Sequence, residues 1–174
     1  MTADIAIVAD ADAFARIAAE DVRALTRAAT DSTFYRDDLT PEQVADNGRI
    51  VSISGPTAEA AARNDHQRFA AAMVGGRFAG FVVATRHGPG DHELDWLMVS
   101  PDHHGTPVSR ALMAHGMAWL GLDSPIWLTV IRHNERAIRF YRRFGFEIDP
   151  ATELRRVVPG WVMRRPAGGI APMS

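Results

Sequence analysis

Residues 92–146 carry the clearest structural signal in the chain: HELDWLMVSPDHHGTPVSRALMAHGMAWLGLDSPIWLTVIRHNERAIRFYRRFGF. Apolar residues fill two short segments, and they recur at spacings of three and four in two longer ones. The pattern therefore predicts two strands and two helices in alternation, at 92–99, 107–120, 126–131 and 134–144. Gly145 is the expected end of the second helix, because glycine readily adopts the left-handed conformation found just beyond helix ends.

The part of the chain before this stretch is predicted to begin with helices. The expected segments are a strand at 5–8 and helices at 10–29, from Pro41 onward, and at 57–64. Thr40 followed three residues later by Gln43 is the pattern of a capping box, which marks a helix start. Gly55-Pro56 is expected to interrupt the chain, because proline breaks a helix interior.

Strands dominate from Arg68. Two apolar runs separated by Gly75-Gly76 predict a hairpin, and His87 to Asp91 reads as the next turn. The expected strands outside the 92–146 stretch are 68–74, 78–85, one from Phe146 onward, and 160–165. The absence of repeats and linkers favours one mixed α/β domain over residues 1–174, with 166–174 as a mobile tail.

Composition excludes several functional classes. The chain has no cysteine, which excludes disulfides, thiolate metal sites and a cysteine nucleophile, and no lysine, which excludes a Schiff base or a P-loop. Its net charge is −2 and its pI is 6.4, which argues against general nucleic-acid binding, although residues 67–174 are net basic and could hold an anion. No apolar run reaches the roughly 18 residues of a membrane span, and acids stand where a secretion signal needs bases. We therefore expect a cytoplasmic protein that binds neither nucleic acid nor membrane.

The turn after the strand at 92–99 is a candidate anion site. A helix N-terminus placed after a strand presents free N–H groups and the positive end of a dipole, which suit phosphate. The alternative is an ordinary capped helix with Thr106 as N-cap and Pro107 at the first position. Local sequence leaves both interpretations open.

The second helix presents polar groups on an otherwise apolar stripe. Asn134, Ile138 and Tyr141 stand at i, i+4 and i+7, so they share one face. One interpretation is that Asn134 and Tyr141 belong to a functional site. The other is that Asn134 is an N-cap and Tyr141 is a core residue.

Taken together, the two segments resemble the GNAT superfamily of acyl-CoA-dependent N-acetyltransferases over roughly residues 68–165. Six residues of the later family motif fall in register: Asn134, Ala137, Phe140, Tyr141, Gly145 and Phe146. The family's pyrophosphate loop reads Arg/Gln-x-x-Gly-x-Gly/Ala after Val-x-Pro. Val99-Ser100-Pro101 matches that start, whereas His104, Pro107 and Ser109 substitute all three signature positions.

The resemblance implies an α/β (α+β) fold with a mixed, mostly antiparallel sheet and flanking helices. Parallel strands 92–99 and 126–131 would splay apart, acetyl-CoA would lie in the gap, and residues 1–66 would shape the acceptor site. The residues implied to contact the cofactor are Leu97, Met98, Val99, His104, Gly105, Thr106, Val108, Ser109, Arg110, Asn134, Ala137 and Tyr141. One or two arginines of the second helix would reach the 3′-phosphate of CoA, while the others form a solvated face.

The implied reaction is direct attack of an amine on the thioester in a ternary complex. Tyr141 would lie near the sulfur and act as the acid. Glu93 falls on the position of the base in the histone acetyltransferase subgroup, and Asp95 shares its strand face. The other candidates for the base are His92, His103 and His133, because histidine titrates near neutral pH. No metal is expected, since His103-His104 lacks further ligands at suitable spacing.

A second functional class stays open. Pro107 favours a module that binds or senses CoA without catalysis, or a protein-interaction domain, whereas Tyr141, Asn134 and Glu93 favour an enzyme. The acceptor amine is not readable from the sequence. The resemblance leaves a homodimer open.

Overall fold

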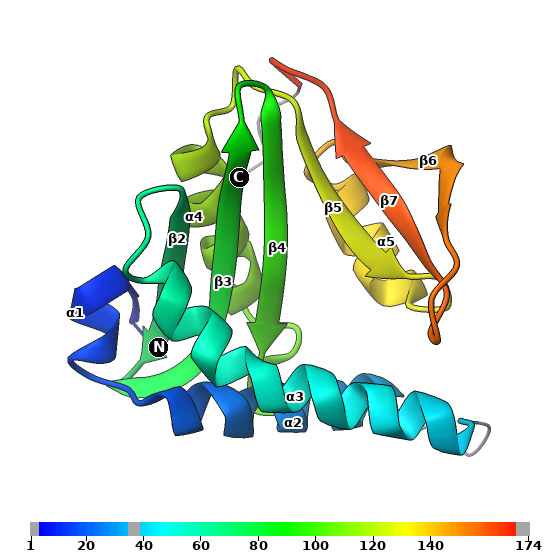
Figure 1. Ribbon diagram of the computed structural model, residues 1–174. Coiled ribbons are helices and arrows are strands. Elements are labelled where there is room, and N and C mark those ends of the chain that lie inside the picture. Colours follow the sequence, from blue (N-terminus) through cyan, green and yellow to red (C-terminus); the bar gives the residue numbers. More distant parts are fainter. Residues whose placement is uncertain (1–3, 35–38, 170–174) are drawn as a thin grey trace.

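The computed structural model describes residues 4–34 and 39–169 and shows a single mixed sheet with helices on both faces (Figure 1). The strands are β1 (Ile5–Ala9), β2 (Gln67–Val74), β3 (Arg77–Gly88), β4 (Asp91–Val99), β5 (Ile126–Ile131), β6 (Glu147–Leu154) and β7 (Gly160–Arg165). The helices are α1 (Asp10–Phe14), α2 (Ala19–Phe34), α3 (Pro41–Ala61), α4 (Val108–Leu120) and α5 (Glu135–Arg142), with a short 3₁₀ turn at Pro101–His103. The α/β fold class and the alternation predicted over 92–146 are confirmed.

The sheet order is β1-β2-β3-β4-β5-β7-β6, and every neighbouring pair is antiparallel except β4 and β5. These two parallel strands pair only at His92 with Ile126 and at Glu93 with Trp127. Beyond Glu93 they diverge, so the sheet opens into a V that widens toward α2 (Figure 1). The splayed parallel pair expected from the resemblance is therefore present.

Each face of the sheet buries its own apolar cluster. Residues of α4 and α5 join one cluster, which includes Leu112, Met117 and Ile138. Residues of α1, α2 and α3 join the other around Phe69 and Phe81, whose rings stack at 5.7 Å between centroids. The two layers hold β4 firmly from both sides while its edge toward β5 stays open.

Local signals place several element ends where the sequence predicts them. The Oγ1 of Thr40 accepts from the Gln43 N–H and the Gln43 side chain accepts from the Thr40 N–H, which completes the capping box of α3. Gly75 and Gly76 both have positive φ, as a tight hairpin turn requires. The strand β3 continues through Gly88, so the turn predicted at 87–91 is shorter than expected.

Two predictions about the N-terminal part are wrong. The single helix expected over 10–29 is divided into α1 and α2, because the Asp21 carboxylate accepts from the Ala18 N–H at 2.8 Å and starts a new helix. Gly55-Pro56 does not interrupt the chain, since α3 runs through it. At this point Gly55 lies against the backbone of Ala19, and Pro56 is exposed, so tertiary packing overrides the local preference.

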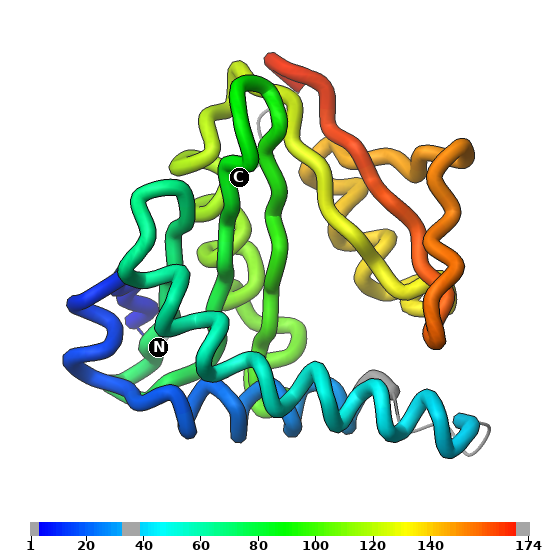
Figure 2. Tube along the Cα trace, viewed as in Figure 1, coloured from blue at the N-terminus to red at the C-terminus, as the bar shows by residue number. Residues whose placement is uncertain are grey.

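Long-range contacts connect the two ends of the molecule to the sheet. The connection between β6 and β7 lies near the first turn of α3 (Figure 2). Gln43 Nε2 donates to the Val157 carbonyl at 3.3 Å there. Of the predicted tail, residues 166–169 contact the body of the protein through Gly168 N–H, which donates to the Leu122 carbonyl at 3.0 Å. Residues 170–174 lie outside the described part of the chain.

Candidate active-site cleft

The V between β4 and β5 is a cleft with a volume of about 810 Å³. Its floor comes from Ala29 and Thr30 of α2, and its two walls come from β4 and β5. The turn at 103–107 and the N-terminal parts of α4 and α5 close its far end. A cavity of this size suits a large organic ligand.

The splay itself creates binding groups. Because β4 has no ladder partner toward β5 beyond Glu93 in the described residues, backbone N–H and C=O groups along Leu97 to Val99 face the cleft. Buried backbone groups need partners, so this edge is suited to bind an extended chain that carries amides.

The turn before α4 presents an uncapped helix end. The structure places Pro107 at the N-cap and Val108 at the first helical position, one residue later than the sequence predicts. No side chain caps the helix by the usual bond, because the Thr106 hydroxyl donates to the His103 carbonyl at 2.7 Å and meets Val108 N–H only at 3.4 Å. The amides that follow Pro107 are therefore placed to receive an anion.

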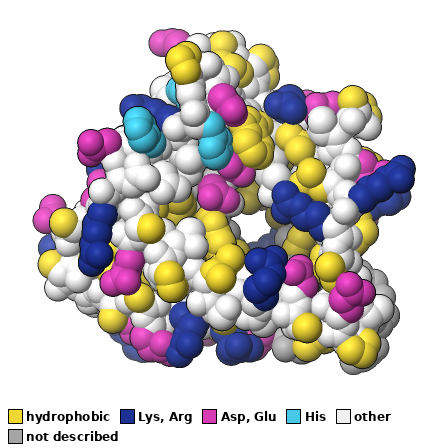
Figure 3. Space-filling view, viewed as in Figure 1, with side chains coloured by type: hydrophobic (Ala, Val, Ile, Leu, Met, Phe, Trp, Pro, Cys, Tyr) yellow, Lys and Arg dark blue, Asp and Glu magenta, His cyan; other side chains and the backbone are white. Residues whose placement is uncertain are grey.

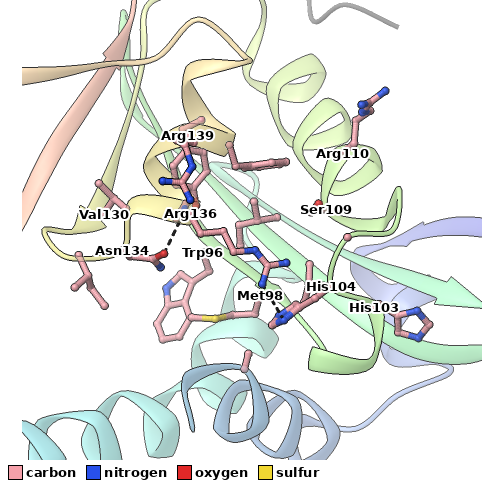
Figure 4. A pocket seen from close by; sticks show the side chains of 18 of the residues that line it. Trp96, Met98, His103, His104, Ser109, Arg110, Val130, Asn134, Arg136 and Arg139 are labelled. Atoms are coloured by element: carbon pink, nitrogen blue, oxygen red, sulfur yellow. Dashed lines mark hydrogen bonds between the residues drawn. The ribbon is translucent and has the colours of Figure 1, made fainter. Parts of the chain in front are cut away.

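An arginine from α5 reaches across the cleft to this turn. Arg136 donates to His104 Nδ1 at 3.2 Å, as Figure 4 shows, so the ring proton lies on Nε2. Burial, followed by the charge of Arg136, lowers the pKa of His104, and this histidine is therefore neutral at pH 7. In the same view the Arg110 side chain points away from this pair. Arg136 is the cation held at the turn.

Asn134 and Tyr141 lie together on the cleft side of α5. Asn134 is the N-cap, and its Oδ1 accepts from Ala137 N–H at 3.1 Å. Tyr141 packs edge-on against Phe140 and Phe146, and burial raises its pKa to about 12. The phenol is consequently protonated and can serve as a hydrogen-bond donor.

Two carboxylates of β4 have different surroundings. Glu93 bonds His87 at 2.7 Å, with its side chain only 12% exposed, and burial is the main cause that raises its pKa. Asp95 is the extra residue of a β-bulge, because Trp96 pairs with Val83 while Leu94 pairs with Ala84. Its carboxylate is accessible from the cleft, yet the enclosing walls and then the charge of Glu93 raise its pKa to about 6.

The structure brings most of the predicted site residues to this cleft. Those that line it are Leu97, Met98, Val99, His104, Gly105, Thr106, Ser109, Arg110, Asn134, Ala137 and Tyr141. Val108 is 1% exposed and packs in the core, so only its backbone belongs to the turn. Glu93 lies beside the cleft rather than on its wall, whereas Asp95 lines it.

Two threonines of the lining carried no separate signal in the sequence. Thr30 of α2 and Thr129 of β5 line the cleft, and tertiary packing decides that their side of each element is turned toward it. Arg136, Arg139 and Arg143 line the cleft together, and their helical spacing could have shown that they share a side of α5. In the described part of the chain, no helix is long and apolar enough to cross a membrane, and no group of three potential metal ligands occurs.

Comparisons with known proteins give a consistent result. A model of the acetyltransferase (GNAT) family matches residues 25–146. An uncharacterized N-acetyltransferase of Mycobacterium tuberculosis (strain ATCC 25618 / H37Rv) is 37% identical over 84 residues, and homologues of the same description occur in strain CDC 1551 and in Mycobacterium bovis. The match covers 46% of this chain and 53% of that relative, so the chain spans about half the length of the curated relatives it matches.

Solved structures share the fold. PaiA N-acetyltransferase from Thermoplasma acidophilum, in complex with coenzyme A, superposes with a TM-score of 0.68 at 16% identity, covering 94% of this chain and 99% of that chain. Nourseothricin acetyltransferase is 29% identical with a TM-score of 0.50, covering 59% of this chain and 66% of that chain. A putative streptothricin acetyltransferase from Bacillus anthracis str. Ames, in complex with acetyl coenzyme A, has a TM-score of 0.52 at 19% identity, over 59% and 64% of the two chains.

Proposed function

Since the chain belongs to the GNAT family of acetyltransferases, we propose that it transfers an acetyl group from acetyl-CoA to an amine by direct attack within the β4–β5 cleft. The observation that carries the proposal is the composition of this cleft. Four features meet there: an open strand edge, an uncapped helix end with an arginine held over it, a half-buried tyrosine, and a carboxylate of raised pKa.

The cleft offers separate places for the parts of CoA. The β4 edge at Leu97 to Val99 and the side chain of Asn134 would bond the amides of the pantetheine arm. The N–H groups of Gly105, Val108 and Ser109 and the side chain of Arg136 would hold the pyrophosphate, because a helix N-terminus and a guanidinium both favour anions. The N–H groups of His104 and Thr106 already donate within the turn. Arg139 and Arg143, which also line the cleft, would bind the 3′-phosphate. Acetyl-CoA supplies the activated acyl group, and the residues around it bind and orient it.

Each chemical step has a candidate residue. Asp95 would take the proton from the incoming ammonium, with Glu93 beside it as the second carboxylate of the pair. The amine nitrogen then bonds the acyl carbon, and a backbone N–H of the β4 edge stabilises the oxyanion. The carbon–sulfur bond breaks, and the Tyr141 hydroxyl gives its proton to the departing thiolate, which ends as the free thiol of CoA. The second proton lost by the amine nitrogen returns to the Tyr141 oxygen, so the amide product is neutral and the phenol is restored.

Pro107 favours the alternative function, a module that binds CoA without turnover. Titration calorimetry with acetyl-CoA followed by a free-thiol assay over a panel of amines tests both functions. The proposal requires binding and amine-dependent thiol release. Binding without thiol release from any amine would leave the binding module as the function.

A further inference from the structure

We propose that the acceptor is a monoamine carried on an apolar group, whose ammonium lies at Asp95 and whose apolar part lies on Trp96 and Met98. The inference rests on the proposed function and adds the substrate class. Its basis is a division of the cleft into a basic part, which suits the anionic groups of CoA, and an apolar part that contains one acid.

The basic part of the cleft belongs to the side of the sheet that α4 and α5 cover. Every arginine and histidine that lines the cleft in the described residues comes from the turn before α4, from α4 or from α5 and its C-cap: His103, His104, Arg110, Arg136, Arg139 and Arg143. The phosphates of CoA are assigned to this part. The acceptor therefore has the remaining part, which faces α2.

Trp96 and Met98 form the β4 wall of the part that faces α2. Both pack against the apolar cluster of α1, α2 and α3, whereas Leu97 and Val99 pack against the cluster on the opposite face. The Trp96 ring stacks on Phe81 at 6.4 Å between centroids and is only half-buried, so part of it lines the cleft. Figure 4 shows the Trp96 and Met98 side chains next to one another on the α2 side.

The floor and the opposite wall of this part are also mainly apolar. The floor is made by Ala29 and Thr30, and the Thr30 hydroxyl donates to the Arg27 carbonyl at 3.2 Å within its own helix. The β5 wall is made by Thr129 and Ile131, whose neighbours along β5 belong to the cluster on the other face. Methyl groups and aromatic surface therefore dominate the space in front of β4.

Asp95 supplies the negative charge at this apolar surface. Of the described residues that line the cleft, it alone is acidic, and the bulge places it next to Trp96. Burial, followed by the charge of Glu93, raises the pKa of Asp95 to about 6, although the charges of His87 and then Arg156 act in the opposite direction. His87 itself bonds Glu93 at 2.7 Å. The cations nearby thus do not compensate the two acids, and an ammonium in the cleft would stabilise the ionised carboxylate.

The surroundings disfavour a second charge on the acceptor. A polar end placed against Trp96 and Met98 would lose water without gaining a hydrogen bond, whereas an apolar end gains by leaving water. Figure 3 shows a hollow between the part of the molecule over β4 and the part over β5 and β7, with apolar side chains at its border, acidic ones on the β4 side and arginines on the opposite side. A second ammonium that reached across the hollow would meet like charges.

Matched amines test the substrate class. Thiol release from acetyl-CoA would be measured with hexylamine and with the terminally substituted aminopentanol and diaminopentane, which have the same number of non-hydrogen atoms. The three amines differ only at the end away from the reacting nitrogen: a methyl, a hydroxyl or a second ammonium. We expect kcat/KM to favour hexylamine over each of the others by about tenfold or more, since their polar ends would be buried without partners.

A polar substitution in the β4 wall completes the design. Met98→Gln should narrow the preference for hexylamine over aminopentanol, mainly through the KM of the amine, because the new amide is a partner for the hydroxyl. Ile53→Gln is the matched control: Ile53 is 39% exposed on α3 and is not among the residues that line the cleft, so this variant should keep the preference. Melting temperatures would show that both variants are folded.

The outcomes separate this inference from the proposed function. Aminopentanol or diaminopentane used as efficiently as hexylamine by the parent protein would overturn the inference alone, even where Met98→Gln does not fold. The same holds for a folded Met98→Gln variant with an unchanged preference, and for thiol release that occurs only with amines outside this series. Thiol release from no amine at all would overturn the proposed function together with the inference.

Discussion

Asp95 is the carboxylate whose environment is best suited to a base. Its raised pKa of about 6 predicts that kcat/KM falls as the pH drops through about 6, since the protonated carboxyl cannot accept a proton. Asp95→Asn should lower turnover and remove the fall of kcat/KM at acidic pH. Glu93→Gln should move the pH at which kcat/KM falls, without removing the fall. A pH–rate profile of Asp95→Asn that matches the parent would reassign the base to Glu93 or to a histidine.

The ionised carboxylate of Asp95 should also lower the free energy of unfolding. The folded-state pKa of Asp95 lies above its ordinary value of 3.8, so the unfolded state gives up the proton more readily, and folding stability falls as the pH rises from about 4 to about 6. Asp95→Asn should therefore raise the melting temperature at pH 7 and have no such effect at pH 3. The gain should be modest because solvent in the cleft screens the charge.

Tyr141 is the residue proposed to assist the leaving group. Tyr141→Phe removes a hydroxyl and keeps the ring contacts with Phe140 and Phe146, so the fold should persist. Turnover should fall by about 10²–10⁴-fold with little change in acetyl-CoA affinity, as is typical when an acid or a donor in the transition state is lost. Turnover equal to that of the parent in the thiol assay would make Tyr141 a core aromatic without a catalytic role.

Pro107 removes one donor from the turn that is proposed to hold pyrophosphate. Pro107→Gly restores that N–H, and a hydrogen bond to a charged group contributes about 1.5–3 kcal/mol, against a cost of about 1 kcal/mol for the more flexible backbone. We expect severalfold tighter CoA binding by calorimetry and slightly lower thermal stability. Pantetheine lacks pyrophosphate and is the control ligand. If neither ligand binds differently, the turn does not hold the pyrophosphate in this way.

At the scale of elements, the packing of α2 against α3 depends on Gly55. A Cβ at this position would lie 2.6 Å from the Ala19 carbonyl oxygen, which is backbone and cannot move aside cheaply. Gly55→Ala should lower the free energy of unfolding by about 1–3 kcal/mol in urea titrations, the usual cost of overpacking.

The matched control for this contact is on the same helix. Gly48 has no atom within 4 Å of an added Cβ, so Gly48→Ala should raise the free energy of unfolding by about 0.5–1 kcal/mol. Equal effects of Gly48→Ala and Gly55→Ala would show that the helix propensity of alanine, and not the contact with Ala19, determines the change in the free energy of unfolding.

At the scale of the whole molecule, the cleft divides the sheet into a β1–β4 part and a β5–β7 part joined by a short parallel ladder. A ligand that bonds β4 on one side and α5 on the other should hold these parts together. CoA at 100 times its Kd should stabilise the fold by about 2.7 kcal/mol and raise the melting temperature by about 5–11 °C. Hydrogen exchange should slow at 97–99, 104–110 and 134–141. A melting temperature that does not respond to CoA would contradict the assignment of the cleft.

Some features of this protein follow from short segments alone. The capping box at Thr40, the hairpin at Gly75-Gly76 and the N-cap at Asn134 are confirmed because each depends on residues within one turn of the chain. The motif over 92–146 also carries the resemblance to the family, because its residues from Asn134 to Phe146 fall in register with the family motif. These local preferences place the turn at 104–107 and Tyr141 on the elements where the structure has them.

Other features come only from contacts between distant segments. The course of α3 through Pro56 depends on Ala19, and the position of Arg136 depends on His104 of another element. The bulge at Asp95 is a mismatch between two strands, so neither strand alone reveals it. The β6–β7 connection is held against α3, far away in the sequence, by the bond from Gln43 to the Val157 carbonyl. The sequence by itself determined the elements and the family, whereas tertiary packing decided which charges meet in the cleft, because the direction of a side chain across a sheet or a cleft depends on neighbours that local periodicity does not encode.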